Sequence, residues 1–288
     1  MEWLERLNSA MDYIEEHLTE NIRYDEAARI ACCSTFHFQR MFSYIAGVPL
    51  SEYIRRRRMT MAAFMLQQSD VKVIDLAMQF GYDSPTAFNR AFQSVHNVPP
   101  SAARETGVPL NSYPPISFHI SIKGDAKMDY RIEKKDAFRI IGLKTPLSKD
   151  VEKNFQDVPL FWQKVAQSGA MPKLMALADG EPKGILGVCS CMGDETWEYY
   201  ISVISNLPAE CDGLPGLSEY TVPACTWAVF PGKGAMPEAI QELEKRIVTE
   251  WLPSSGYEYA NAPDIEVYLN ADMQNSLFEV WLPIIKKA

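Results

Sequence analysis

Residues 75–99 have the sequence DLAMQFGYDSPTAFNRAFQSVHNVP, and a related stretch, DEAARIACCSTFHFQRMFSYIAGVP, occupies residues 25–49. When residues 25–51 are aligned with residues 75–101, nine positions are identical. Among them are a serine, two phenylalanines and an arginine in the middle of each copy, followed by a shared Val-Pro pair. The N-terminal third of the chain is therefore built from a duplicated unit.

Each copy has the pattern of two short helices joined by a tight turn. In the second copy, Ile74, Ala77 and Met78 have the i, i+3, i+4 spacing of a helix with one buried side. Gly81 follows where a left-handed C-terminal cap is needed, and Ser84 is placed to cap the next helix. A connecting helix over residues 51–69 completes an all-α N-terminal domain with two helix-turn-helix units.

The second helix of each copy has an apolar side and a side that we expect to face solvent. The inward residues are Phe38, Met41 and Phe42 in the first copy and Ala87, Phe88, Ala91 and Phe92 in the second. The outward residues are Phe36, Gln39 and Arg40 in the first copy and Pro85, Thr86, Asn89 and Arg90 in the second. Because Arg can bridge two guanine acceptors and Gln or Asn can pair with adenine, these helices suit the major groove of double-stranded DNA.

Positive charge is confined to the same part of the chain. The whole chain has a net charge of −9, whereas residues 34–104 hold eight basic and four acidic residues, a balance of +4. Four arginines, Arg55–Arg58, lie on the connecting helix. At least one is expected to contact an acid of the first helix, and Arg55 is our candidate for a phosphate contact.

These stretches resemble the DNA-binding domain of the AraC/XylS family, in its MarA, SoxS and right-origin-binding group. The resemblance lies in Ser34 to Phe42, in Asp75 to Ser84, and in Ala87 through Phe92 to the Asn97-Val98-Pro99-Pro100 segment. It implies two recognition helices in neighbouring major grooves. The family's base-contact positions fall here on Phe36, Gln39, Arg40, Pro85, Thr86, Asn89 and Arg90. Phe36 stands where the family has tryptophan, and residues 85–87 are less polar than the family pattern.

The second half predicts an α+β domain. Residues 107–127 contain several prolines and a short alternating piece at residues 116–122, which indicates a linker with an edge strand. Strand-like runs occupy residues 138–143, 185–191, 197–204, 225–230, 265–269 and 277–285, with helical patterns over residues 155–167 and 237–251. The order corresponds to two βαββ repeats. The expected domains are residues 1–106, the linker over 107–127, and residues 128–288.

Three strands share a Glu-x-aromatic step. The pairs are Glu198/Tyr200, Glu266/Tyr268 and Glu279/Trp281, and the residues between and around them are apolar or aromatic. Neighbouring strand residues point to opposite faces, so one face of the sheet is expected to pack on helices and the other to present acids among rings. Such a face suits an apolar or cationic ligand, and the simpler alternative is a hydrated sheet surface.

The region from Met128 to Lys286 resembles the GyrI-like small-molecule-binding domain. The segments that carry the resemblance are Phe138 to Leu143, Phe161-Trp162, Val222-Pro223-Ala224, Glu250 to Pro253 with Ser255-Gly256-Tyr257, Ile265 to Tyr268, and Phe278 to Ile284. The resemblance places the family's pocket glutamate on Glu279. The residues expected to form the walls are Trp162, Tyr200, Tyr268 and Trp281.

The sequence therefore predicts a cytoplasmic transcription regulator that is not an enzyme and whose partners are DNA, a small-molecule effector and RNA polymerase. We expect no cofactor, metal or membrane partner, because the six cysteines and four histidines form no ligand motif and no apolar run approaches membrane-spanning length. Two alternatives for the second domain are a protein-interaction module and a hydrolase that uses a glutamate with an aromatic hydroxyl.

Overall fold

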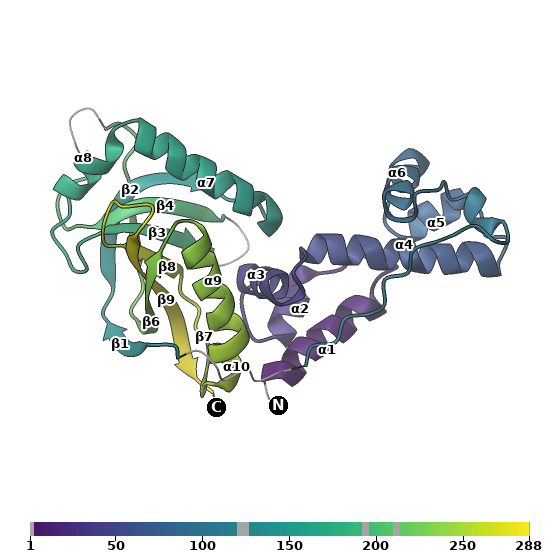
Figure 1. The fold of residues 1–288 in the computed structure, drawn as a ribbon, viewed down its shortest axis with the longest axis horizontal. Helices are drawn as coiled ribbons and strands as arrows, with labels where there is room; N and C mark the ends of the chain where they lie inside the picture. Colours follow the sequence, from purple (N-terminus) through teal and green to yellow (C-terminus); the bar gives the residue numbers. More distant parts are fainter. Residues whose placement is uncertain (1–2, 120–126, 192–195, 210–213, 288) are drawn as a thin grey trace. The chain divides into compact units, whose positions relative to one another are not determined.

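The computed structural model describes residues 3–119, 127–191, 196–209 and 214–287. The chain forms two compact units, one from residues 1–31 and 46–120 and the other from residues 32–45 and 121–288. Helices dominate the N-terminal region and a large sheet dominates the C-terminal region (Figure 1), which confirms the predicted order of fold classes along the chain. Among the described residues, no helix combines the length and the apolar character needed to span a membrane.

The first unit is helical. Its elements are α1 (Trp3–Glu16), α2 (Tyr24–Ile30), α4 (Leu50–Gln68), α5 (Val73–Gln79), α6 (Pro85–His96) and the 3₁₀ turn η1 (Ala102–Arg104). A core between α4, α5 and α6 includes Met59, Leu76, Phe80, Phe88 and Phe92, none of which is exposed to solvent. Burial of such side chains contributes about 1.5–3 kcal/mol each, so these short helices depend on the packing between them.

Local capping determines where α5 and α6 begin and end. The Ser84 hydroxyl accepts a hydrogen bond from the amide of Ala87 at 3.2 Å, at the start of α6. Gly81 has φ +76° beyond α5, and Asn97 has φ 62° at the end of α6. These left-handed positions favour glycine and asparagine because neither incurs the usual steric penalty there. The caps predicted at Gly81 and Ser84 are confirmed.

The predicted buried stripe of α5 is confirmed for Ala77, which is 1% exposed, and is wrong for Ile74 and Met78. Ile74 and Met78 are 50% and 72% exposed, and Leu76 and Phe80 are fully buried in their place. Ala87, expected to face inward on α6, is also exposed. Leu76 and Phe80, which follows α5, pack in one core with Phe88 and Phe92 of α6, and this packing decides which apolar residues are buried.

One arginine of the four-arginine run ties α4 to α1. Arg57 Nη2 lies 2.6 Å from Glu15 Oε2, and the Tyr53 hydroxyl donates to Glu15 Oε1 at 2.6 Å. Arg57 Nη1 also donates to the carbonyl of Tyr113 at 2.6 Å. The Arg57 side chain is only 7% exposed, and the pKa of its guanidinium is raised by Glu15 although burial opposes the shift. This confirms the expected contact with an acid of the first helix.

The segment of residues 107–119 is extended and packs on the helices of the first unit, to which it belongs. Asn111 Nδ2 donates to the carbonyl of Val95 at 2.6 Å, and the amide of Tyr113 donates to Thr60 Oγ1 at 3.1 Å. No strand occurs within these residues. The expected edge strand also included residues 120–122, which lie outside the described residues.

The second unit combines α3 (Thr35–Ala46, whose last residue belongs to the first unit) with a nine-stranded sheet and its helices. The strands are β1 (Arg131–Lys135), β2 (Phe138–Pro146), β3 (Ile185–Ser190), β4 (Glu198–Ile204), β5 (Ser218–Val222), β6 (Cys225–Gly234), β7 (Tyr257–Tyr259), β8 (Asp264–Tyr268) and β9 (Ser276–Lys286). The helices are α7 (Val151–Gln167), α8 (Ala170–Ala176), α9 (Glu238–Arg246), η2 (Ile247–Trp251) and α10 (Leu252–Ser254). The sheet order is β1-β6-β9-β8-β3-β4-β2-β5, every pairing is antiparallel, and β7 pairs with β9.

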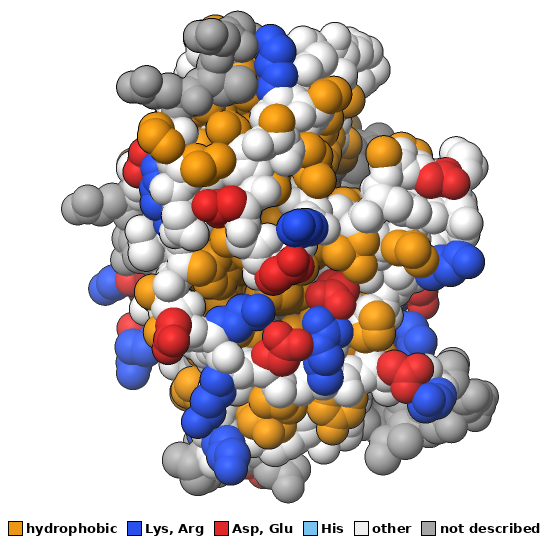
Figure 2. Space-filling view, turned by 90° about the vertical axis from the view of Figure 1, so that its left-hand side faces the viewer, with side chains coloured by type: hydrophobic (Ala, Val, Ile, Leu, Met, Phe, Trp, Pro, Cys, Tyr) orange, Lys and Arg blue, Asp and Glu red, His pale blue; other side chains and the backbone are white. Residues whose placement is uncertain are grey.

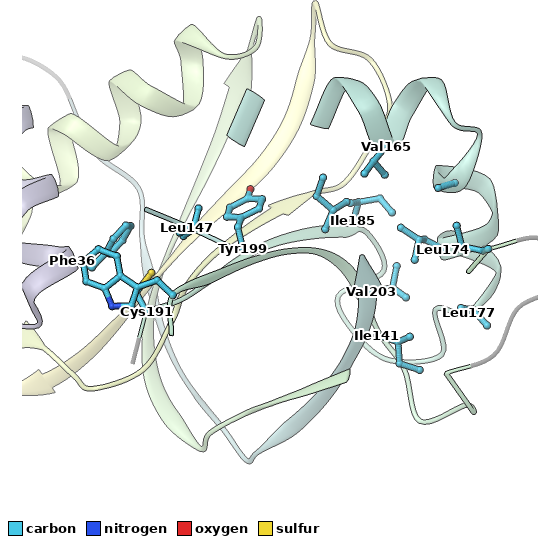
Figure 3. Packing of buried hydrophobic residues seen from close by; sticks show 14 of the residues in the cluster. Phe36, Ile141, Leu147, Val165, Leu174, Leu177, Ile185, Cys191, Tyr199 and Val203 are labelled. Carbon is cyan, nitrogen blue, oxygen red and sulfur yellow. The ribbon is translucent and has the colours of Figure 1, made fainter. Parts of the chain in front are cut away.

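Each face of this sheet has its own core. On the face covered by α7 and α8, Val165 and Leu174 of the helices pack on Ile185 and Val203 of the strands (Figure 3). Phe36 of α3 belongs to the same cluster, near Leu147 and Cys191. Because alternate strand residues point the same way, this face also carries Tyr199, Glu266 and Tyr268.

The opposite face is closed by the curvature of the sheet. Its cluster joins Val222 of β5 with Trp227 and Val229 of β6, although β5 and β6 lie near opposite ends of the strand order. Trp227 and Trp281 are fully buried there with ring centroids 6.0 Å apart. Buried side chains of the strands themselves thus form the core on this face, without a covering helix among the residues of the cluster.

We predict that Arg57→Ala lowers the free energy of unfolding by about 3 kcal/mol, because it removes a nearly buried guanidinium and leaves the partly buried carboxylate of Glu15 without its ion-pair partner. Chemical denaturation followed by circular dichroism measures the effect. Arg56→Ala is the matched control. Arg56 pairs with Glu52 at the surface with a third of its side chain exposed, and its loss is expected to cost less than about 1 kcal/mol. Equal losses for the two variants would contradict the assignment.

Candidate functional site

A cavity of about 840 Å³ lies on the helix-covered face of the sheet in the second unit. Helices α3, α7, α8 and α9 and strands β3, β4 and β8 all contribute to its walls. Most of the lining is apolar, and examples are Leu147, Val158, Met171, Ile185, Ile240 and Met273. This volume falls within the range of small-molecule sites, which typically enclose about 300–1,000 Å³.

Glu266 is the acid at the centre of a chain of hydrogen bonds in this cavity. The Tyr268 hydroxyl donates to Glu266 Oε2 at 2.8 Å, and the Tyr199 hydroxyl donates to the same atom at 3.0 Å. Trp162 Nε1 in turn donates to the Tyr199 hydroxyl at 2.9 Å. Burial raises the pKa of Glu266 to about 7, despite the two hydroxyl donors and the positive charge of Arg40. Near neutral pH this carboxyl is therefore poised between its neutral and charged forms.

Gly187 provides the space for this hydrogen-bond network. It lies on β3 directly opposite Glu266 of β8 and Ile201 of β4. A Cβ atom at position 187 would lie 2.1 Å from the Tyr199 hydroxyl and 2.8 Å from Glu266 Oε2. Such distances are too short for any non-bonded contact, so only glycine leaves Tyr199 free to reach the carboxylate.

A second group of charges surrounds Arg40 of α3. Its Nη1 donates to Asp264 Oδ2 at 2.9 Å, and its Nη2 donates to Glu244 Oε1. Tyr44, one turn further along α3, donates its hydroxyl to Glu244 Oε2 at 2.6 Å. Arg40, Glu244 and Asp264 have side chains that are only 14%, 8% and 8% exposed. Buried charges persist where they are paired and hydrogen-bonded, as here.

His37 is the third residue of α3 that takes part in this group. His37 Nε2 lies 3.1 Å from Asp264 Oδ2, and the imidazole stacks on the ring of Tyr259 at 4.1 Å between centroids. Burial opposes ionisation of Asp264, but the nearby His37 and Arg40 outweigh it and lower the pKa of this carboxyl. Its Oδ1 atom is buried and has no hydrogen-bond partner among the residues that the structure describes. Asp264 is thus held as a charged group by α3.

The structure separates the residues that the sequence grouped as a ligand pocket. Trp162 and Tyr268 line the cavity. Tyr200, Glu279 and Trp281 do not, because they lie on the opposite face of the sheet, in register with Ile265 and Val267. The expectation that all five line one pocket is therefore wrong. The reason is register, since strands that share the same motif can present it on opposite faces.

Glu279 is engaged in contacts on that opposite face. Its carboxylate lies 2.9 Å from Arg131 Nη1 and accepts a hydrogen bond from Trp281 Nε1 at 2.8 Å. Glu198 similarly accepts from the Tyr200 hydroxyl at 2.7 Å and pairs with Lys144. Figure 2, which views the side of the molecule at the left of Figure 1, shows acidic and basic side chains next to one another among hydrophobic ones.

Three cavity residues were missed in the sequence analysis. Glu266 was recognised in its Glu-x-aromatic step but not chosen, and Tyr199 and Glu244 were not singled out. Pairing of the strands in register would have identified Glu266 and Tyr199, because both share a face with Ile201 on the helix side. Glu244 has no such signal, since only the packing of α9 brings it to the cavity.

The predicted DNA-contacting side chains are in contrasting environments. On α6, Pro85, Thr86 and Arg90 are exposed and Asn89 is half-buried, as expected for an outward side. On α3, Phe36 and Gln39 are only 5% and 4% exposed, so the expectation that they face solvent is wrong. Phe36 meets Trp197 edge-on at 5.5 Å, and Gln39 Nε2 donates to the carbonyl of Lys149 at 3.3 Å. Contacts with the sheet region bury this side of α3.

Arg55, the predicted phosphate contact, is partly exposed to solvent. Its side chain is 36% exposed, and it pairs with Glu52 one turn earlier on α4 at 2.6 Å. It also donates to the hydroxyl of Ser94 on α6. Among the described residues, no group of three or more His, Cys, Asp or Glu side chains could hold a metal ion.

The helical region, and the sheet region with its ligand-sized cavity, have the architecture expected of a DNA-binding regulator with a small-molecule domain. The comparisons with known families agree. Residues 128–285 match the GyrI-like small molecule binding domain, and residues 27–106 match a helix-turn-helix domain. The chain belongs to the GyrI-like family and carries an AraC-type DNA-binding domain, and it is a transcription regulator.

Several curated relatives are transcription factors. The chain is 37% identical to the transcriptional activator AarP of Providencia stuartii over 98 residues. This aligned region covers 34% of this chain and 73% of AarP. It is 32% identical over 115 residues to the multiple antibiotic resistance protein MarA of Escherichia coli, or 37% of this chain and 91% of MarA. The match to the regulator YbfP of Bacillus subtilis is 35% identical and covers only 33% of that protein.

Solved structures resemble the two regions separately. SAV2435 bound to tetraphenylphosphonium is 22% identical with a TM-score of 0.47, covering 55% of this chain and 94% of the other. The DNA-binding domain of AdpA in complex with a target DNA is 28% identical with a TM-score of 0.32, covering 34% of this chain and 88% of the other.

The raised pKa of Glu266 predicts a pH-dependent stability. This carboxyl has an ordinary pKa of 4.5 and a pKa of about 7 in the folded protein, so the folded state binds more protons between these values. The contribution of Glu266 is fully present below pH 4.5 and is lost as the pH rises through 7, a change of roughly 3 kcal/mol.

Glu266→Gln is expected to remove this component, so that the variant gains stability relative to the wild type between pH 5 and pH 8. Denaturant unfolding followed by tryptophan fluorescence at both pH values measures the difference. Glu242→Gln, an exposed change on α9, is the control and should follow the wild type. A wild-type pH dependence that persists in Glu266→Gln would refute the assignment.

Proposed function

We propose that the second unit senses an apolar, cationic small molecule and that the chain regulates transcription in response. The observation that carries the proposal is Glu266, a carboxyl inside an apolar cavity with the rings of Tyr199, Tyr268 and Trp162 around it. A carboxylate together with aromatic faces favours a cation that can shed its water. The finer architecture that we propose is two helix-turn-helix units, α2/α3 and α5/α6, followed by two βαββ repeats.

The charge state of Glu266 gives the cavity a preference for cations over neutral ligands. Among the described side chains, no Lys or Arg forms an ion pair with Glu266, so a bound cation would be its first such partner. Burial disfavours the charged carboxylate, and a positive ligand reverses this by stabilising it. Cation binding is therefore expected to release a proton near neutral pH.

We propose binding without turnover. The hydroxyls of Tyr199 and Tyr268 both have pKa values raised well above the ordinary value, mainly by burial. They keep their protons and donate them in hydrogen bonds to Glu266, which makes them poor nucleophiles and poor bases. A hydrolase would show itself by consuming a reactive electrophile, with loss of that activity in Glu266→Gln.

For the DNA-binding region we propose base contacts from Pro85, Thr86, Asn89 and Arg90 of α6, and from Phe36, Gln39 and Arg40 of α3 once these are exposed. Arg55 is proposed to contact phosphate, because it lies on α4 with a third of its side chain in solvent. We also propose that ligand binding changes either DNA affinity or contact with RNA polymerase. A protein-interaction role for the second unit predicts no effect of small cations on tryptophan fluorescence.

We predict that tetraphenylphosphonium quenches the tryptophan fluorescence of the full chain and that Glu266→Gln weakens its affinity by at least about tenfold. Triphenylphosphine oxide, a neutral molecule of related shape, should bind the two proteins equally. Glu279→Gln removes an acid of the opposite face and should leave the affinity within about twofold. Loss of binding in Glu279→Gln but not in Glu266→Gln would reverse the assignment of the pocket acid.

We predict that Arg90→Ala costs about 1–3 kcal/mol of DNA-binding free energy and relaxes specificity at one base pair, because α6 presents this exposed arginine for base contact. A duplex selected from a random pool serves as the DNA, and fluorescence anisotropy measures the affinity. Gln93→Ala, another exposed position on α6, is the control and should bind normally. Equal affinities of the Arg90→Ala variant and the wild type would exclude α6 as a recognition helix.

A further inference from the structure

We infer that Glu244 and Asp264 form an internal cation site whose occupant is Arg40, and that DNA and this site compete for α3. The ligand-dependent step of this inference rests on the proposed function of the cavity. In the state described here α3 is held by the second unit, and a cation in the cavity is the signal that releases it.

The guanidinium of Arg40 is held by acceptor atoms of Asp264 and Glu244. A guanidinium that reads guanine in the major groove donates from two N–H groups to two acceptors of one base. In this structure Nη1 of Arg40 donates to Asp264 and Nη2 donates to Glu244, while Nε lies 3.4 Å from the Tyr44 hydroxyl. The donors needed for a base are therefore already occupied, and the two states exclude each other.

The neighbours of Arg40 on α3 are also held, by ring contacts with the sheet region and α7. Phe36 packs on Trp197, and His37 is stacked on Tyr259. Tyr44 contacts Phe155 of α7 with ring centroids 6.1 Å apart. Phe36 and Arg40, which the family resemblance assigns to DNA, are thus engaged together with His37 and Tyr44, so release must free several residues of α3 at once.

The cavity and the internal cation site share lining residues. Phe36, Arg40 and Tyr44 line the cavity, as do Glu244 and Glu266. The charge of Arg40 favours ionisation of Glu266, and that of Glu244 opposes it, so the three groups interact electrostatically. A cation bound at Glu266 repels the guanidinium of Arg40 and competes for the nearby carboxylates.

The direction of the coupling follows from these charges. Departure of Arg40 leaves two buried carboxylates without a cation, which is unfavourable unless another positive group replaces it. A bound cation supplies that compensation and shifts the population towards the released helix. By thermodynamic reciprocity, DNA that captures Arg40 must strengthen binding of the cation to the cavity by the same factor.

The test measures the affinity of the full chain for a duplex selected from a random pool, with and without tetraphenylphosphonium. Glu244→Gln keeps the shape of the side chain and removes its charge. It should tighten DNA binding by at least about fivefold and reduce the effect of tetraphenylphosphonium on DNA affinity. Tyr44→Phe deletes one hydrogen bond to Glu244 and should tighten DNA binding by a smaller factor. It serves as the second variant in case Glu244→Gln folds poorly.

Glu242→Gln is the matched control, since it makes the same chemical change on the exposed side of α9 two residues away. Its DNA affinity should equal that of the wild type. If Glu244→Gln and Tyr44→Phe fold and both leave DNA affinity unchanged, the internal site does not restrain α3 and the inference is overturned.

Ligand binding is followed separately by tryptophan fluorescence, so the two proposals can fail independently. Tighter DNA binding by the variants without any binding of tetraphenylphosphonium supports the restraint on α3 and removes the cationic ligand. Binding of tetraphenylphosphonium without any change in wild-type DNA affinity overturns the coupling and leaves the ligand site intact.

Discussion

Three carboxyl groups are buried on one side of the sheet in the second unit, and each needs a hydrogen-bond donor or a positive charge to offset its loss of hydration. Glu266 and Asp264 alternate along β8, and Glu244 faces them from α9. Each would be costly to bury as an isolated charge. Glu266 meets this constraint with two tyrosine hydroxyls and a raised pKa, whereas Asp264 and Glu244 meet it with the guanidinium of Arg40. Gly187 leaves the space that the Tyr199 hydroxyl needs to reach Glu266, and Arg40 links α3 to Asp264 and Glu244.

The same constraint acts on both the carboxyl in the cavity and the carboxylates that hold α3. A carboxyl with a pKa near 7 in an apolar cavity has a latent preference for a positive partner. A neighbouring pair of carboxylates already has one, supplied by the chain itself. Arg40 of α3, a predicted DNA-contacting residue, lines the same cavity as Glu266 and interacts with it electrostatically.

The duplicated helices illustrate how the same sequence pattern acquires different roles. Arg40 and Arg90 occupy equivalent positions in the two copies, as do Phe38 and Phe88. Both phenylalanines are fully buried, but Arg90 is exposed and Arg40 is enclosed by acids of the second unit. Duplication therefore produced two similar apolar sides, and the surroundings of the polar sides made the copies unequal.

The sequence by itself determined the order of fold classes, the caps of α5 and α6, and the bounds of most strands to within a few residues. These features depend on local chemistry: Ser84 caps its own helix, Gly81 adopts its own φ, and apolar alternation marks a strand wherever it lies. The contact between Arg57 and the first helix was also within reach, because a run of four arginines beside an acidic first helix favours at least one ion pair.

Only the tertiary structure decided which face of the sheet each motif occupies and which side of α3 is covered. Glu266 and Glu279 have the same local pattern, and a shift of one residue in strand register moves a side chain to the opposite face. Phe36 and Gln39 are buried by Trp197 and Lys149, more than a hundred residues away along the chain. Such partners are chosen by packing in space, so no spacing along the sequence specifies them.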